Sequence, residues 1–259
     1  MVPAWLGIEE AVDVDTARPD VEVTAMPTLE LIELYPSPYS ERLRWVLDLK
    51  GLSYRRTPYV PVASEESHSE RTGIRTAPVL LADGEVIGDS DRSVDWLEVA
   101  HPSPRLVPDD PRRRAQVRTW ELYATEVLGP AARLVMIGRL KAMNVQPLAD
   151  HFAAKYHWDE AEEARVDRLL RTALPELAAA VAGSGHLVGD EFTRADLTVA
   201  ALLTPVLGLP PDDLFAIDPG TRTMFGTPFG ADPSLAPLRD WRDRMYRSHR
   251  GRRVEPAAA

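Results

Sequence analysis

The sequence contains no cysteine among its 259 residues. A disulfide framework is therefore excluded, and no thiol of the protein can act as a nucleophile, a redox centre or a zinc ligand. Thiol–disulfide exchange of the usual kind is excluded for the same reason. If this protein carries out sulfur chemistry, the sulfur must arrive on a bound small molecule.

Long apolar runs and an excess of basic residues are missing as well. No apolar stretch approaches the ~20 residues that a membrane-spanning helix needs. The net charge of −10 argues against nucleic acid or an anionic membrane as the main partner. The N-terminal segment MVPAWLGIEEAVDVD is acidic and lacks the basic and apolar parts of a signal peptide. Together these absences predict a cytoplasmic protein with no nucleic acid and no membrane partner.

The length and the composition allow one large domain or two modest ones with buried cores. We predict a mixed α/β domain over residues 28–101 and an all-α domain over residues 111–249. A linker rich in proline and charge, residues 102–110, separates them. Residues 1–27 and 250–259 show little periodicity, and we expect an N-terminal extension and a tail there.

Strand and helix patterns alternate in the first predicted domain. A buried strand is expected over residues 29–35, followed by an amphipathic helix with Ser40 as its N-cap. Residues 79–87 suit a hairpin, because Asp83-Gly84 supplies the two positive φ angles of a type I′ turn. Asp89 is placed to begin the next helix.

The second predicted domain shows helical periodicity almost throughout. Apolar residues recur at helical spacing over residues 166–181. Thr193 and Asp196 are the ends of a capping box that opens a helix reaching Leu207. A loop rich in proline and glycine is expected over residues 207–237, and a last helix over residues 238–248.

Three elements of the first predicted domain converge if it folds in this way. The first is the Ser37-Pro38-Tyr39-Ser40 turn after the first strand. The second is Ala77-Pro78, where the proline opens a strand in either a cis or an ordinary trans form. The third is Asp89-Ser90, which offers a carboxylate for an ammonium group and free amides for a carboxylate. Simple N-capping is the alternative interpretation of this pair.

The segments SPYSERLRWVLDLKGL, TAPVLLADGEVIGDS and FTRADLTVAALL, in this order, resemble the cytosolic glutathione transferase superfamily of the serine type. The resemblance covers roughly residues 29–247. It implies a thioredoxin-like N-terminal domain followed by an all-α C-terminal domain. It also implies glutathione as co-substrate, no metal, and a homodimer with the active site near the subunit boundary.

The resemblance also assigns roles to individual residues. Ser37 matches the catalytic hydroxyl position of the family and would donate a hydrogen bond to the sulfur of bound glutathione. Ala77 would pair with the cysteinyl part of glutathione, Pro78 would be the cis-proline after it, and Asp89-Ser90 would bind the γ-glutamyl end.

The expected effect of Ser37 is to stabilise the thiolate. A hydrogen bond to a charged group is worth roughly 1.5–3 kcal/mol. At about 1.4 kcal/mol per pKa unit, this lowers the thiol pKa by about one to two units. The thiolate would then attack a small electrophile, in conjugation or in related lyase, dehalogenase or isomerase chemistry.

Several alternatives stay open at this point. Tyr35 and Tyr39 compete with Ser37 as the catalytic hydroxyl. Arg75, and with it Arg71, is placed to reach the glycyl carboxylate of glutathione. The native thiol is glutathione or another low-molecular-weight thiol. The competing function is a non-catalytic binding or protein-interaction module of the same fold.

Two features depart from the family pattern. The segment from Arg133 to Trp158 is irregular, although this part of the helical domain usually shapes the acceptor site. The Ser37 turn also lacks the cysteine of the isomerase class that acts on maleylacetoacetate, so the sequence does not predict membership of that class.

Overall fold

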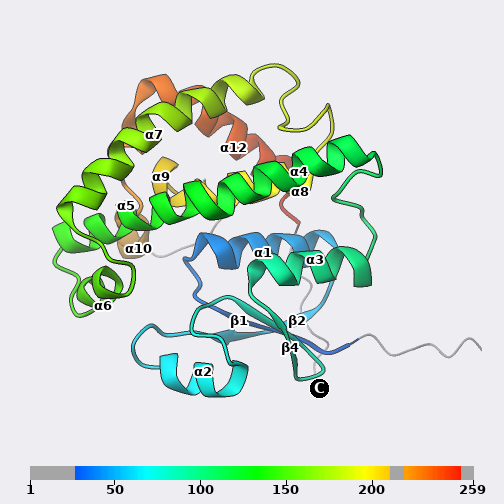
Figure 1. Ribbon diagram of the computed structural model, residues 1–259, viewed down its shortest axis with the longest axis horizontal. Helices are drawn as coiled ribbons and strands as arrows, with labels where there is room; N and C mark the ends of the chain where they lie inside the picture. Colours follow the sequence, from blue (N-terminus) through cyan, green and yellow to red (C-terminus); the bar gives the residue numbers. More distant parts are fainter. Residues whose placement is uncertain (1–26, 211–218, 252–259) are drawn as a thin grey trace, which may run out of the picture.

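The computed structural model describes residues 27–210 and 219–251. The predicted extension apart from Pro27, and the tail after Gly251, lie outside these ranges and stay predictions. In Figure 1 the described chain forms two parts, a small sheet with its helices and a larger group of helices stacked above them.

The sheet has four strands in the order β2-β1-β3-β4. They are β1 (Leu29–Glu33), β2 (Tyr54–Pro58), β3 (Val79–Ala82) and β4 (Glu85–Gly88). β1 is parallel to β2, whereas β3 is antiparallel to both β1 and β4. The register pairs Ile32 with Val79 and Leu80 with Gly88. The ends of β1 and β4 and the start of β3 therefore meet at one edge of the sheet.

Three helices cover this sheet, as Figure 1 shows: α1 and α3 on the face toward the helical part, and α2 on the other face. Their bounds are α1 (Pro38–Leu49), α2 (Glu65–Thr72) and α3 (Ser90–Ala100). Leu43, Val46 and Leu97 are fully buried, so α1 and α3 form the centre of the molecule. This is the thioredoxin-like α/β arrangement that we predicted.

The rest of the described chain is helical. α4 (Pro111–Tyr123) continues through a π-helical segment η1 (Ala124–Leu128) into α5 (Gly129–Ala142). The following elements are α6 (Leu148–Lys155), α7 (Glu160–Val181), α8 (Arg194–Leu202), α9 (Thr204–Leu207), α10 (Pro219–Met224), α11 (Pro228–Ala231), a short 3₁₀ segment η2 (Pro233–Leu235) and α12 (Ala236–His249). α8 packs against α1 and α4, which joins the two parts. The predicted linker falls between α3 and α4, but the domain boundaries themselves stay a prediction.

Some local predictions are confirmed and others are wrong. Asp83 and Gly84 have φ angles of 51° and 85°, and Thr193 with Asp196 forms the capping box. The Ser40 cap is wrong, because α1 begins at Pro38 and Ser37 is its N-cap. Proline at the first helical position lacks the N–H that would otherwise need a partner, which favours this earlier start. The expected loop over residues 207–237 contains α10 and α11.

Candidate active site

Ser37 lies between the end of β1 and the first turn of α1. Its φ and ψ angles are −69° and 130°, and its side chain makes no capping hydrogen bond. Backbone hydrogen bonds hold this turn instead. The Ser37 N–H donates to the Leu34 carbonyl, and the Glu41 N–H donates to the Ser37 carbonyl, both at 2.9 Å. The half-buried hydroxyl is therefore not used by the helix that it precedes.

The Ala77–Pro78 peptide bond is cis. Pro78 is buried and Ala77 is half-buried at the start of β3. Within the described chain, the backbone of Ala77 takes part in none of the loop or turn hydrogen bonds. Its N–H and C=O are therefore free of loop contacts, as the pairing with an extended ligand requires.

His68 holds the loop that leads to this proline. Its Nε2 lies 3.1 Å from the Thr76 carbonyl oxygen, so Nε2 carries the proton and donates. Burial lowers the pKa of His68, and its ring packs edge-on against Tyr59 with 5.0 Å between the centroids. The sequence offered no signal for this role, because His68 lies in a polar helix eight residues before Thr76.

Asp89 and Ser90 form the N-terminus of α3. Oδ1 of Asp89 accepts from the N–H groups of Asp91 and Arg92, both at 3.1 Å, so Asp89 is an N-cap. Among the described residues Oδ2 has no partner, and Asp89 is exposed. Ser90 is 5% exposed in the first turn. Capping therefore occupies only one of the two oxygens, and the second is left for a cation.

The register of the sheet brings these three elements together. Ser37 follows the end of β1, Pro78 precedes the start of β3, and Asp89 follows the end of β4. These three strand ends lie at one edge of the sheet. The predicted convergence of the Ser37 turn, Ala77-Pro78 and Asp89-Ser90 follows from the strand pairing, while the binding roles of these residues stay predictions.

The two tyrosines that compete with Ser37 have other contacts. The Tyr39 hydroxyl donates to the Thr125 carbonyl at 3.0 Å, and burial raises its pKa to about 12. Cζ of Arg44 lies 4.8 Å from the centroid of the Tyr35 ring, and Cζ of Arg56 lies 4.9 Å from it. A hydroxyl has one proton to donate, so Tyr39 in this position cannot also donate to a thiolate.

Of the two arginines expected near the glycyl carboxylate, the side chain of Arg71 has a partner within the described chain and that of Arg75 does not. Arg71 makes two hydrogen bonds to Glu30, at 2.8 and 2.7 Å, which ties α2 to β1. Arg75 is exposed, and its guanidinium forms no ion pair with another described residue. Arg71 is therefore committed to the fold, and Arg75 remains the secondary candidate for a ligand carboxylate.

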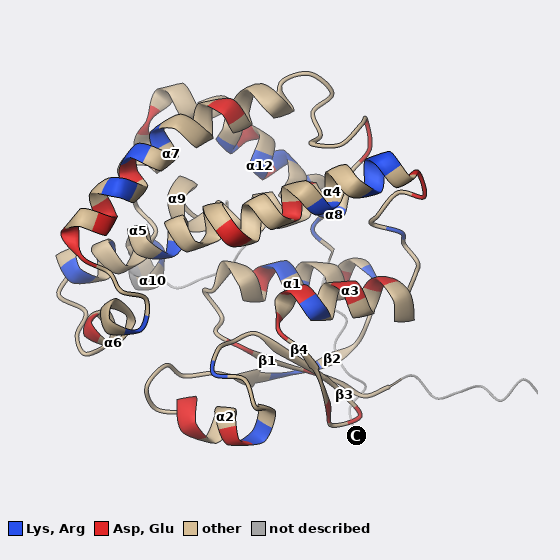
Figure 2. Cartoon of the chain, in the orientation of Figure 1, with Lys and Arg blue, Asp and Glu red and all other residues tan. Residues whose placement is uncertain are grey.

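A buried ionic network joins the two parts of the molecule, and the sequence did not predict it. Oε1 of Glu121 accepts from Nη2 of Arg42 at 3.0 Å and from Nε of Arg194 at 2.6 Å. Nη1 of Arg42 also donates to Asp91 at 2.5 Å. Figure 2 shows charged positions on each of the helices α1, α3 and α4. The network therefore connects α4 and α8 to the first turn of α3.

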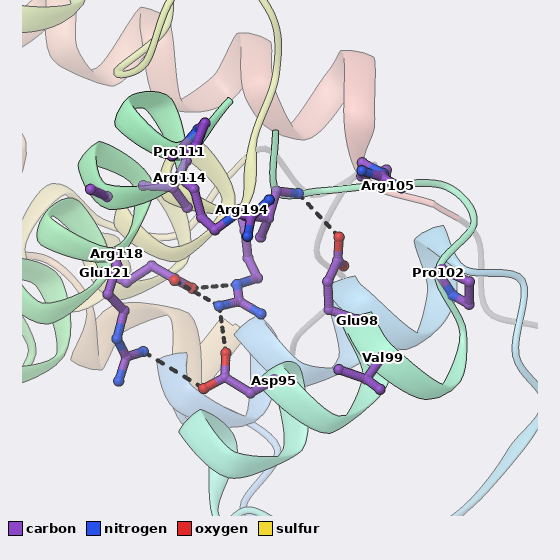
Figure 3. Close-up of a pocket in the computed structure, with 13 residues that line it drawn as sticks. Asp95, Glu98, Val99, Pro102, Arg105, Pro111, Arg114, Arg118, Glu121 and Arg194 are labelled. Carbon is purple, nitrogen blue, oxygen red and sulfur yellow. Dashed lines mark hydrogen bonds and ion pairs between the residues drawn. The ribbon is translucent and has the colours of Figure 1, made fainter. Parts of the chain in front are cut away.

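A cavity of about 640 Å³ lies beside this network, between α3, the segment after it and α4 (Figure 3). Figure 3 shows Arg194 pointing toward Asp95 and Glu121 at its base. Val99, on its rim, is 83% exposed. Because the lining includes neither Ser37 nor Pro78, this cavity is separate from the predicted thiol site.

No metal centre is indicated in the described ranges, where no three His, Asp or Glu side chains are grouped to hold an ion. Likewise, none of the described helices is both long enough and apolar enough to cross a bilayer.

A sheet in the order β2-β1-β3-β4 with a cis-proline before β3, joined to a helical domain, defines a protein of the thioredoxin-like, two-domain class. Residues 31–105 match the glutathione S-transferase N-terminal domain, and residues 136–216 match the glutathione S-transferase C-terminal domain. The chain belongs to the cytosolic glutathione S-transferase superfamily.

Individual relatives agree with this assignment. A protein named "Probable maleylacetoacetate isomerase" from Caenorhabditis elegans is 31% identical over 176 residues, which cover 67% of this chain and 76% of that protein. The β-etherase LigF from Sphingobium sp. strain SYK-6 superimposes with a TM-score of 0.64 at 20% identity, covering 84% of this chain and 94% of LigF. A glutathione S-transferase from Methylobacterium radiotolerans, in complex with glutathione sulfonate, gives a TM-score of 0.55 at 23% identity, covering 90% and 99%.

The first of these relatives bears on the isomerase class that acts on maleylacetoacetate. The sequence did not predict membership of that class, because its turn has no cysteine. The chain is nevertheless similar, over two thirds of its length, to a protein named as a probable member, and membership itself stays untested. The absence of cysteine from the turn remains as a local difference.

Proposed function

We propose that this protein is an enzyme that binds glutathione at the sheet edge and activates its thiol for attack on a small electrophile. Ser37 is the catalytic hydroxyl, and Ala77, Pro78, Asp89 and Ser90 hold the tripeptide. The proposal is supported above all by the position of the Ser37 hydroxyl. It stands at the N-terminus of α1, without a capping hydrogen bond, at the edge where the three elements meet.

The chemistry follows from this position. The glutathione thiol loses its proton to solvent, and the Ser37 hydroxyl donates a hydrogen bond to the resulting thiolate. The unpaired N–H groups in the first turn of α1 add a favourable field of about 0.3–1 kcal/mol. The sulfur then forms a bond to an electrophilic carbon of the acceptor.

Two outcomes are open to the same thiolate. In conjugation a leaving group departs with its bonding electron pair. In cis–trans isomerisation the sulfur adds to a double bond, the remaining single bond rotates, and the thiolate is expelled again. Because one relative is named as a probable isomerase, we include isomerisation as well as conjugation in the proposal.

A homodimer and a cytoplasmic location are further parts of the proposal, and both rest on family membership. The exposed Val99, at the rim of the cavity beside α3, is a side chain that a second subunit would cover. Size-exclusion chromatography with light scattering measures the mass directly. A mass near 28.7 kDa, that of one chain, would contradict the dimer.

The catalytic proposal is tested by titrating glutathione into the wild-type protein, Ser37→Ala and the control Tyr39→Phe. Calorimetry measures binding, and the ultraviolet absorbance of the thiolate measures ionisation. We expect the pKa of the bound thiol to lie about one to two units below that of free glutathione, and this shift to disappear in Ser37→Ala alone. The absence of binding at millimolar glutathione would contradict glutathione as the thiol. An unchanged shift in Ser37→Ala would remove Ser37 from catalysis and leave the non-catalytic module as the better interpretation.

A further inference from the structure

Arg133 lies on α5, in the segment whose sequence departs from the family pattern. Cζ of Arg133 lies 4.2 Å from the centroid of the Tyr156 ring and 5.4 Å from that of the Tyr39 ring. The Tyr39 side chain packs against the start of the same helix, where a Cβ on Gly129 would lie 2.2 Å from its hydroxyl. Since Arg133 follows Gly129 by one turn of α5, the three side chains face one another.

Arg133 is half-buried, and its guanidinium has no acceptor in the described chain. No carboxylate lies within 4.0 Å of it there, and its guanidinium N–H groups donate to no other described residue. The other arginines between the two parts are paired: Arg42 and Arg194 share Glu121. A guanidinium against a ring face keeps its N–H donors at its edge, where they suit a carboxylate.

Arg133 also adjoins two segments of the proposed thiol site. Tyr39 is two residues after Ser37, a chain distance of at most about 7 Å. Tyr156 follows Lys155, whose Nζ donates to the Arg75 carbonyl at 3.1 Å, just before Ala77. The cation therefore lies against Tyr39 in the first turn of α1 and against Tyr156, whose neighbour Lys155 contacts the loop that leads to the cis-proline.

We infer that Arg133 binds a carboxylate group of the electrophilic substrate, so that the acceptors of this enzyme are organic anions. The inference rests on the proposed function and deepens it. A neutral acceptor would leave the guanidinium donors without an anion, whereas a carboxylate takes two parallel N–H bonds. Arg133 thereby sets specificity for the acceptor, while the Ser37 end of the site treats all acceptors alike.

The test uses two acceptors that differ in charge: 4-chloro-3-nitrobenzoate and its neutral amide, 4-chloro-3-nitrobenzamide. In both, the glutathione thiolate forms a C–S bond at the ring carbon that carries chlorine, and chloride leaves with the electron pair of the C–Cl bond. Each kcat/KM is divided by the rate constant of the same acceptor with free glutathione thiolate, which removes the intrinsic difference in reactivity. The variants are Arg133→Gln, Arg133→Lys and the control Arg168→Gln, which removes an exposed charge on α7.

We expect Arg133→Gln to lower the normalised kcat/KM for the benzoate about tenfold, equivalent to ~1.4 kcal/mol. The amide should change less than twofold, Arg133→Lys should recover part of the loss, and Arg168→Gln should match the wild type. Equal losses on both acceptors would overturn the inference. A raised KM for glutathione with unchanged acceptor constants would assign Arg133 to glutathione and also overturn it.

A separate binding measurement tests the anion site at Arg133 independently of the proposed function. If the wild type turns over neither acceptor and shows no bound thiolate, the proposed function fails. Binding of 4-nitrobenzoate, a non-reacting anion, is then compared by calorimetry in the wild type and Arg133→Gln. Binding that is lost in the variant supports the anion site by itself, and equal or absent binding contradicts it.

Discussion

Replacing Glu121 with glutamine tests how strongly the buried network joins the two parts of the molecule. The carboxylate is 0% exposed and accepts three hydrogen bonds, one from Arg42 at 3.0 Å and two from Arg194 at 2.6 and 2.8 Å. Glu121→Gln preserves the shape of the side chain but removes its charge. Both guanidiniums then stay buried with one fewer counter-ion.

The size of the expected loss in unfolding free energy depends on the carboxylate partners that Arg42 and Arg194 retain. Removing one partner of a buried ion pair costs about 3–5 kcal/mol, because an uncompensated charge stays in the interior. Arg42 keeps Asp91 and Arg194 keeps Asp95, whose side chains are 34% and 52% exposed. Because each arginine retains one carboxylate partner, we expect a loss near the lower end of this range of about 3–5 kcal/mol, at about 3 kcal/mol. That is a large share of the roughly 5–15 kcal/mol by which folded proteins are stable.

Urea denaturation followed by tryptophan fluorescence measures the free energy of unfolding. The matched control is Arg118→Gln, because Arg118 pairs with Asp95 at 3.9 Å on the surface, with 45% of its side chain exposed. The control should change stability by less than about 1 kcal/mol. The loss in Glu121→Gln should also persist at 1 M salt, since buried pairs are screened much less than exposed ones. A loss below about 1 kcal/mol, or one equal to that of the control, would refute the reasoning.

Two further predictions concern the sheet and the contact between α1 and α5. The hydrogen bond from Arg71 lowers the pKa of Glu30 from 4.5 to about 2, so this carboxylate stabilises the fold above pH 4.5 and loses that effect as the pH falls toward 2. Glu30→Gln should flatten this acid decline in the unfolding temperature, and an unchanged profile would contradict the assignment. Gly129→Ala should cost about 1–3 kcal/mol by displacing the Tyr39 hydroxyl. In denaturant titrations the same substitution should cost less in a Tyr39→Phe background, and an equal cost would argue against the contact.

The parts of the fold that the sequence predicted are those with local physical signals. The Asp83-Gly84 hairpin and the capping box at Thr193 depend on residues close together in the chain, and both are present. The α2 helix was missed, since its sequence EESHSERT lacks an apolar stripe. Its stability comes instead from tertiary contacts such as the pair between Arg71 and Glu30.

In the candidate site, too, the features with a local sequence signal were predicted and the long-range contacts were not. The three converging elements follow from strand order, which the motifs indicated, and the start of α1 was misplaced although Pro38 marked it. By contrast, Arg42 and Glu121 are separated by 79 residues, and no periodicity connects them. Charged residues in a sequence are expected on the surface, so only the folded chain distinguishes a buried arginine from a solvated one.

The absence of cysteine gives the two ends of the proposed site different tasks. A serine hydroxyl can stabilise a thiolate but cannot form a mixed disulfide with it, so the sulfur of the bound thiol stays available for attack on the acceptor. The Ser37 end then governs how much thiolate is present and does not discriminate among acceptors. On the proposal made above, discrimination comes from side chains of the helical domain beside the first turn of α1. On α5 the charge beside that turn is Arg133, whose Cζ lies 5.4 Å from the Tyr39 ring centroid. Loss of Ser37 should therefore slow every acceptor, whereas loss of Arg133 should change their order.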